Sequence, residues 1–245
     1  MKNYKMTIEY DGSRYLGWQR LPKSDRTIQG KLENVISQMC KVDIKIIGSG
    51  RTDAGVNSLG QVANFKADVD LSLYEIQEYI NHYLPNDIVV TEMEEVNERF
   101  HSRYNVKLKE YTYHIYTGDF QSPFYRKYSW HIKENLDMDS ISRAIEILQG
   151  THDFLGFPSV KKANKSTVRT INSVNYKQDG PLLSFVFTGD GFLHNMVRII
   201  MGTLVEVGHH KMTPQDVENV LETRIRADAG ITCPPHGLFL SAVHY

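Results

Sequence analysis

The period of the apolar side chains changes several times along residues 1–102. Residues 4–10 alternate apolar and polar side chains, which predicts a half-buried strand. An apolar stripe at helical spacing follows Thr27, a residue suited to cap the start of a helix. Ser72 and Glu75 form a capping box that predicts a second helix. With strands predicted at residues 4–10, 44–47, 61–65 and 88–93, the order is β-α-β-β-α-β.

The rest of the chain repeats that order. A helix is expected over residues 139–148, and a long apolar helix over residues 192–207, where Gly208 stops it. A short extra helix begins after Thr213, because Pro at the next position suits the first turn. Strands are predicted at residues 106–116, 168–176, 182–188 and 238–243.

These patterns predict an α+β protein with two ferredoxin-like βαββαβ halves, residues 1–102 and residues 103–245. We expect the halves to form an extended antiparallel or mixed sheet. Helices would cover one face of that sheet, and an active-site cleft would lie on the other face. The uncovered face is then available to a ligand.

The composition narrows the class of protein. At 41% hydrophobic and 23% charged residues, the 245-residue chain is an ordinary globular one. It has no run of about 18 apolar residues and no secretory segment at its start, so we expect a cytoplasmic protein without a membrane span. Cys40 and Cys233 are isolated, which argues against a disulfide framework or a zinc site. A net charge of −1 still allows a local basic cleft.

Residues 48–57, GSGRTDAGVN, are the stretch with the most obvious chemistry. Three glycines surround a cation, a hydroxyl and a carboxylate, in a spacing that fits neither the dinucleotide fingerprint nor the P-loop. Asp53 is therefore the candidate reactive group. The alternative is an Asp that only caps a turn through its own backbone.

Arg198 lies within a stretch where nearly every other residue is apolar. A guanidinium in that position needs an acceptor, because burial of an unpaired charge is costly. His194, Asn195 and Gly202 share its helical face, so this stripe can border a cleft. The alternative is a side chain that reaches solvent or binds carbonyls at a helix end.

Cations and tyrosines share one face of the strand at residues 106–116. They suit RNA, because phosphates attract Lys and unstacked bases attract an aromatic plane; plain packing of the tyrosines is the alternative. The residues of this face are Lys107, Lys109, Tyr111, Tyr113 and Ile115. A basic rim can be formed by Arg14, Arg20, Lys23, Arg26, Arg99, Arg103, Lys161, Lys162, Lys165 and Arg169.

Nine motifs, in order from about residue 4 to the C-terminus, resemble those of the TruA-type tRNA pseudouridine synthases. They are YDGSRYLGWQ (10–19), TIQG (27–30), GSGRTDAGV (48–56), GQVANF (60–65), F-x-x-R (100–103), K-E-Y-x-Y (109–113), G-x-H-D-F (150–154), H-x-M-V-R (194–198) and G-L-x-L (237–240). The resemblance implies isomerisation of uridine to pseudouridine at positions 38, 39 and 40 of the tRNA anticodon stem-loop. It also implies a homodimer that uses no cofactor and no metal.

The resemblance assigns roles to seven residues. It makes Asp53 the nucleophile, Arg51 the residue that helps displace and hold the flipped nucleotide, and Arg198 the partner of the carboxylate. It assigns substrate binding to Tyr111, stacked on the target base, and to Arg14, Arg103 and Leu240. One departure is Asn57, where the family usually has His.

Several alternatives remain open at this point. Asp53 can attack C1′ or C6 of the nucleotide, or assist loss of the C2′ proton in a glycal route. The rival functions are the same chemistry on a different RNA, a non-catalytic RNA-binding protein, and a hydrolase that releases free uracil.

Overall fold

The computed structural model describes residues 1–159 and 166–245, which form two compact units. Unit 1 comprises Met1–Lys107 and Phe239–Tyr245, and unit 2 comprises Leu108–Leu238. This division differs from the expected halves, 1–102 and 103–245, at both ends of the second half. Residues 239–245, which hold most of the last strand, fall in unit 1, and this strand pairs in parallel with a strand of that unit.

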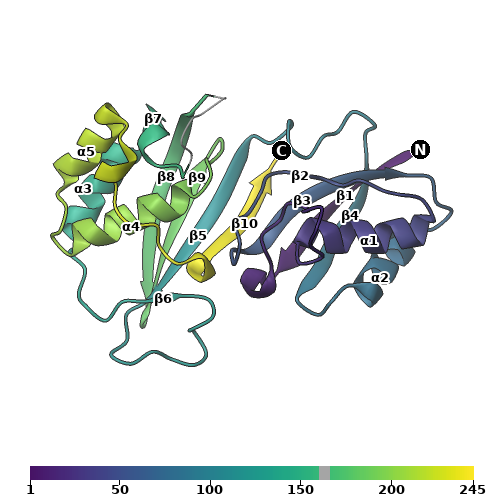
Figure 1. The fold of residues 1–245 in the computed structure, drawn as a ribbon, viewed down its shortest axis with the longest axis horizontal. Helices are drawn as coiled ribbons and strands as arrows, with labels where there is room; N and C mark the ends of the chain where they lie inside the picture. Colours follow the sequence, from purple (N-terminus) through teal and green to yellow (C-terminus); the bar gives the residue numbers. More distant parts are fainter. Residues whose placement is uncertain (160–165) are drawn as a thin grey trace. The chain divides into compact units, whose positions relative to one another are not determined.

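Unit 1 has the predicted βαββαβ order (Figure 1). Its elements are β1 (Lys2–Tyr10), α1 (Ile28–Cys40), β2 (Ile47–Gly48), β3 (Asn57–Ala67), α2 (Leu73–Tyr83), β4 (Ile88–Val96) and β10 (Leu238–His244). The strands β4, β1, β3 and β2 lie side by side in that order and are antiparallel, which is the ferredoxin-like arrangement. β10 runs parallel to β3 at the start of that strand.

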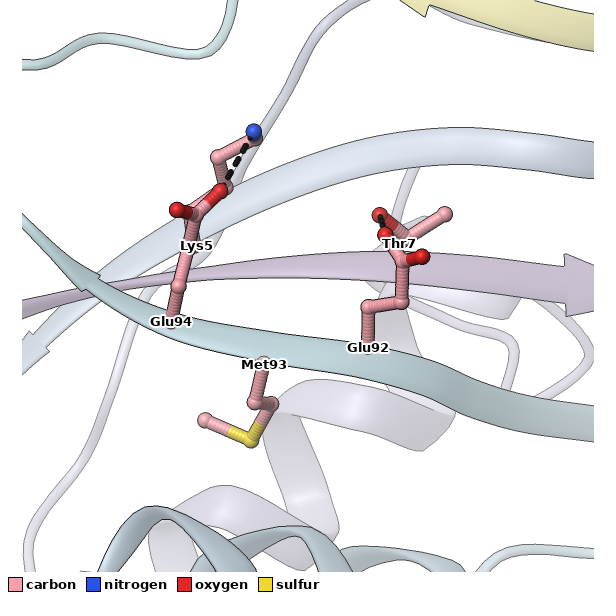
Figure 2. A pocket seen from close by; sticks show the side chains of 5 residues that line it. All are labelled: Lys5, Thr7, Glu92, Met93 and Glu94. Carbon is pink, nitrogen blue, oxygen red and sulfur yellow. Dashed lines mark hydrogen bonds and ion pairs between the residues drawn. The ribbon is translucent and has the colours of Figure 1, made fainter.

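The two faces of the unit 1 sheet differ in chemistry. The apolar residues of β1, from Tyr4 to Tyr10, are buried in one cluster with the apolar stripes of α1 and α2. Lys5 and Thr7 point to the other side, where they bond Glu94 and Glu92 at 2.6 Å and 3.1 Å (Figure 2). We call this second side the polar face of unit 1. Alternation along β1 thus places both helices on one face, as predicted.

Unit 2 contains the first five elements of a second βαββαβ series, two additional strands and one additional helix. Its elements are β5 (Leu108–Tyr116), β6 (Trp130–His131), α3 (Met138–Leu148), β7 (Gly150–Asp153), β8 (Val168–Asp179), β9 (Leu182–Gly189), α4 (Met196–Gly208) and α5 (Pro214–Thr223). The strands β5, β9, β8 and β7 form an antiparallel sheet, and β6 pairs in parallel with β5.

The caps that were read from the sequence are present, but one helix start is corrected. Thr27 caps α1, and Ser72 and Thr213 each form a capping box. The expected helix at residues 192–207 begins four residues later, because Asn195 adopts a left-handed φ of 61° that an α-helix cannot contain. Among the described residues, no helix combines the length and the apolar character that a membrane span requires.

Candidate active site

Residues 48–57 run from the end of β2 to the start of β3, and the backbone of the loop between these strands is hydrogen-bonded to the segment after β1. The amide of Trp18 donates to the carbonyl of Thr52 at 3.1 Å, and the amide of Gly55 donates to the carbonyl of Tyr15 at 3.3 Å. Gly55 has φ 77°, which a residue with a side chain rarely adopts. Two stretches that are about 40 residues apart in sequence therefore form one body.

Two glycines of the segment after β1 allow this close approach. A Cβ atom on Gly12 would lie 2.0 Å from the carbonyl oxygen of Val56. A Cβ atom on Gly17 would lie 2.6 Å from the carbonyl oxygen of Thr52, and Gly17 also has φ +95°. The backbone of the loop consequently occupies space that any side chain at these positions would fill.

Thr52 anchors the centre of the loop in the core of unit 1. Its side chain is buried, and its hydroxyl lies 2.8 Å from the hydroxyl of Tyr10. Burial raises the pKa of Tyr10 well above its ordinary value, so this phenol stays protonated. The neighbours of Thr52 differ, since Arg51 is exposed and Asp53 is half-buried. The inward hydroxyl fixes the residue between the cation and the carboxylate.

Asn57 and Leu240 lie where the loop enters β3. The Asn57 side-chain oxygen accepts the amide of Gly12 at 2.9 Å, so this departure from the family pattern has a structural role. Leu240 is buried in β10, next to Ser58, whose hydroxyl donates to the Leu240 carbonyl at 3.0 Å. The structure therefore brings Leu240 beside the strand that leaves the Asp53 loop.

The two predicted binding arginines of unit 1 have different surroundings. The Nε of Arg14 donates to Asp87 at 2.8 Å, although the side chain is 73% exposed. Asp87 also accepts the hydroxyl of Tyr15 at 2.5 Å, which ties it to the segment after β1. Arg103 is exposed, and its backbone amide donates to the ring of His101 at 3.2 Å. Arg14 thus has a carboxylate partner on its own unit.

Arg198 is held by two oxygen acceptors in unit 2. Its Nε donates to the Cys233 carbonyl at 2.9 Å, and a terminal nitrogen donates to the Asn195 side chain at 2.7 Å. The segment with Cys233 can lie close to α4 because Gly202 has no side chain. A Cβ on Gly202 would be 1.9 Å from the Ile231 carbonyl oxygen. The guanidinium is therefore oriented by a second segment as well as by the residue before its helix.

The two tyrosines on the predicted face of β5 have separate partners. Tyr111 is buried, and its ring meets Phe192 edge-on at 5.2 Å. Tyr113 is buried completely, and its hydroxyl donates to the Pro234 carbonyl at 2.9 Å. Burial raises the pKa of Tyr113 far above its ordinary value. Packing thus accounts for Tyr113, which the sequence alone did not separate from Tyr111.

The predicted site residues divide between the units. Asp53, Arg51, Leu240, Arg14 and Arg103 belong to unit 1, whereas Tyr111 and Arg198 belong to unit 2. The predicted rim residues Lys161, Lys162 and Lys165 lie outside the described residues.

Sequence reasoning did not find the acceptors that orient the side chains of unit 2. The backbone carbonyls of Cys233 and Pro234 accept hydrogen bonds from Arg198 and Tyr113, and a backbone acceptor is marked by no residue type. Asn195 was placed on the Arg198 stripe by helical spacing, and it does contact that side chain. Burial raises the pKa of the Cys233 thiol to about 12, so this thiol stays protonated.

Comparisons with known proteins agree on one family. The sequence profile of a family described as tRNA pseudouridine synthase matches residues 6–105 and 144–245. The whole chain aligns with the whole of tRNA pseudouridine synthase A from Bacillus sp. (strain KSM-64) at 47% identity. It aligns equally completely, at 45% identity, with tRNA pseudouridine synthase A 2 from Bacillus cereus (strain ATCC 14579) and with tRNA pseudouridine synthase A 1 from Clostridium tetani.

One chain of a solved Cbf5–Nop10–Gar1 complex is similar to 82% of this chain, over 45% of its own length, at 14% identity. Its TM-score is 0.34, and this likeness adds nothing to the assignment. The full-length identities and the family profile are sufficient by themselves, and the chain belongs to the TruA-type tRNA pseudouridine synthase family.

Proposed function

We propose that this protein isomerises uridine to pseudouridine at positions 38, 39 and 40 of the tRNA anticodon stem-loop, with Asp53 as the nucleophile. Membership of the family makes the protein a tRNA pseudouridine synthase, an isomerase. The positions in the tRNA and the role of Asp53 are the proposal. One observation carries it: Thr52 is anchored in the core between an exposed Arg51 and a half-buried Asp53.

The reaction is balanced within the nucleotide. The bond from N1 to C1′ breaks, the uracil turns, and a bond from C5 to C1′ forms. C5 then loses its proton and N1 gains one, so no atom is added to or removed from the nucleotide. The base must leave its helix and must be kept from escaping while it is detached. A carboxylate on a firmly held loop is suited to form a temporary bond to C1′ or C6, or to take the C2′ proton.

Three further side chains complete the proposed machinery. Arg51 is exposed beside Asp53 and fills the gap that the flipped nucleotide leaves. Arg198 serves as the cation for the carboxylate, and its bonds to Cys233 and Asn195 support this role because an oriented charge needs no rearrangement during the reaction. Tyr111 stacks on the detached uracil, and the edge of Phe192 holds its ring from the side.

In this proposal two cations and one apolar side chain bind the tRNA. Arg103 is exposed and meets phosphates in this proposal. Arg14 makes a weaker contact of the same kind, because Asp87 already offsets part of its charge. Leu240 contributes an apolar wall beside the base, where water must be excluded.

We also propose that the protein acts as a cytoplasmic homodimer. Phe120 and Phe124 in unit 2 are 85% and 87% exposed, and a second copy would cover such side chains. The expected result is a dimer in sedimentation equilibrium that dissociates at least tenfold more readily when both residues are replaced by Ser. A wild-type monomer, or a double variant that stays as dimeric as the wild type, contradicts this part.

The substrate is tested by mapping pseudouridines in total RNA from cells with and without the protein. We expect sites at positions 38, 39 and 40 of tRNAs to disappear with the protein and other RNAs to be unchanged. Lost sites confined to ribosomal or messenger RNA would overturn the assignment to the anticodon stem-loop.

A further inference from the structure

The segment after β4, residues 97–105, is fastened to the unit 1 sheet by buried amide side chains. The side-chain nitrogen of Asn3 donates to the carbonyls of Asn97 and Phe100, both at 3.0 Å. Asn3 lies in β1 and is 2% exposed. A connecting segment of this length is usually mobile, but here its backbone is tied to a strand of the core.

A second set of hydrogen bonds holds the middle of the same segment. The side-chain oxygen of Asn64 accepts the amide of Ser102 at 2.9 Å and its hydroxyl at 2.7 Å. Asn64 in turn donates to Asn3 at 2.9 Å. The hydroxyl of Tyr245 donates to the Ser102 carbonyl at 2.8 Å. Both the amide and the carbonyl of Ser102 are thereby engaged.

Lys5 shows on which side of the sheet the segment lies. Its side chain projects from the polar face of unit 1, where it bonds Glu94 (Figure 2). Its ammonium nitrogen lies 5.8 Å from the ring centre of Phe100 and 5.2 Å from that of Tyr245. Residues 97–105 therefore run across the polar face, opposite α1 and α2.

This fastened segment presents one aromatic ring and two cations to solvent. Tyr104 is 79% exposed, and its ring stacks on His101 with centres 4.2 Å apart and planes inclined by 29°. The Nδ1 atom of His101 accepts the amides of Arg103 and Tyr104 at 3.2 Å and 3.3 Å, which fixes the imidazole beneath the tyrosine. Arg99 and Arg103, which precede Tyr104 in the same segment, are exposed.

We propose that Tyr104, supported by His101, is a stacking platform for an unpaired nucleobase of the tRNA, and that Arg99 and Arg103 bind the adjacent phosphates. An exposed aromatic face on the same segment as two exposed cations fits an unpaired nucleotide, because every base has a π-face and every linkage carries a negative charge. The fastening by Asn3 and Asn64 means that little order has to be gained on binding. The inference rests on the proposed tRNA substrate and adds a base contact to that of Tyr111.

The test compares Tyr104→Ala with two matched variants. Tyr104→Phe keeps the ring, and Tyr74→Ala removes a 73% exposed tyrosine from α2, on the other side of unit 1. Dissociation constants are measured for an unmodified tRNA transcript, together with KM and kcat. We expect Tyr104→Ala to weaken binding and raise KM by about 5- to 100-fold, the range for loss of one stacked base, with kcat unchanged. The other two variants should stay within about twofold of the wild type.

Salt dependence tests the two cations separately. Each of Arg99→Gln and Arg103→Gln should lower the slope of log affinity against log salt by about 1. The proposal is overturned if Tyr104→Ala binds tRNA as well as Tyr74→Ala does, or if Tyr104→Phe binds as weakly as Tyr104→Ala. Failure of the proposed function looks different, because the wild type would then bind tRNA through Tyr104 but form pseudouridine at positions other than 38, 39 and 40, or form it without needing Asp53.

Discussion

Asp53 in unit 1 and Arg198 in unit 2 are positioned by different means. Asp53 lies on an irregular loop, whose shape depends on backbone contacts with Gly12 and Gly17. Arg198 lies on a regular helix, and the Cys233 carbonyl orients its side chain. An atom added where the loop backbone is in close contact would displace the loop. A side chain on a helix loses its orientation when the groups that donate its hydrogen bonds are removed. Activity should therefore be lost through an added Cβ near the Asp53 loop in unit 1, and through lost hydrogen bonds of Arg198 in unit 2.

The largest effect is expected from Gly12→Ala. The new Cβ would lie 2.0 Å from the Val56 carbonyl oxygen, so the Asp53 loop must move. We expect pseudouridine formation to fall at least about 100-fold, since small displacements of reacting groups are costly, and the free energy of unfolding to fall by about 1–3 kcal/mol. Single-turnover assays and urea unfolding measure both.

Gly180→Ala is the matched control in unit 2. Gly180 has φ +55° in the turn between β8 and β9, and nothing lies within 4 Å of an added Cβ. Its expected cost is about 1–2 kcal/mol from backbone strain alone, with unchanged activity. Equal activity of the two glycine variants would show that the loop contact does not position the reactive group.

The next effect is expected from Arg198→Lys, which keeps the charge but loses the planar fork. One ammonium cannot occupy the sites that the guanidinium uses to bond both Cys233 and Asn195. We expect kcat to fall about 10- to 1,000-fold and the free energy of unfolding to fall by about 1–3 kcal/mol. A lysine variant with the wild-type kcat would show that only a positive charge is needed.

Smaller effects are expected from Tyr113→Phe, which should lower stability, and from Tyr111→Phe, which should leave tRNA affinity nearly unchanged. Removal of the buried Tyr113 hydroxyl leaves the Pro234 carbonyl without this donor, so stability should fall by about 1–2 kcal/mol. Tyr111→Phe keeps the stacking plane and should leave the affinity for tRNA within about threefold of the wild type. Complete loss of activity in Tyr111→Phe would instead assign an acid or base role to its hydroxyl.

The smallest effect is expected from Asn57→His, which restores the residue usual in the family. An imidazole nitrogen can accept the Gly12 amide as the Asn57 oxygen does, so activity should stay within about threefold. Asn57→Ala removes the acceptor and should cost about 1–2 kcal/mol of stability. A tenfold change in the relative rates at which different tRNAs are modified by Asn57→His would show that this residue affects the choice of substrate as well as supporting the loop.

Periodicity and capping residues predicted the helices and the longer strands, but not the short strands β6 and β7. Ser72 with Glu75 predicted where α2 begins, because a capping box satisfies the first helical amides locally, and the proline after Thr213 predicted the start of α5. The start of α4 was missed because the left-handed φ of Asn195 leaves no mark on the pattern of apolar residues.

Contacts between segments that are far apart in the chain could not be predicted from the sequence. The approach of Gly12 to Val56 explains the glycine of the first motif, but only the folded chain shows which backbone it meets. The pairing of β10 with β3 and the place of residues 239–245 in unit 1 are equally non-local. The resemblance supplied the identity of the candidate residues, and the structure supplied what holds them.

The most direct test of the account is pseudouridine mapping on unmodified tRNA transcripts incubated with the purified wild type and with Asp53→Asn. The amide has nearly the shape of the carboxylate but is not a nucleophile. We predict pseudouridine at positions 38, 39 and 40 with the wild type and none with Asp53→Asn, while tRNA affinity and thermal stability stay close to the wild type. Pseudouridine formed by Asp53→Asn at a comparable rate, or free uracil released by the wild type, would contradict the central claim.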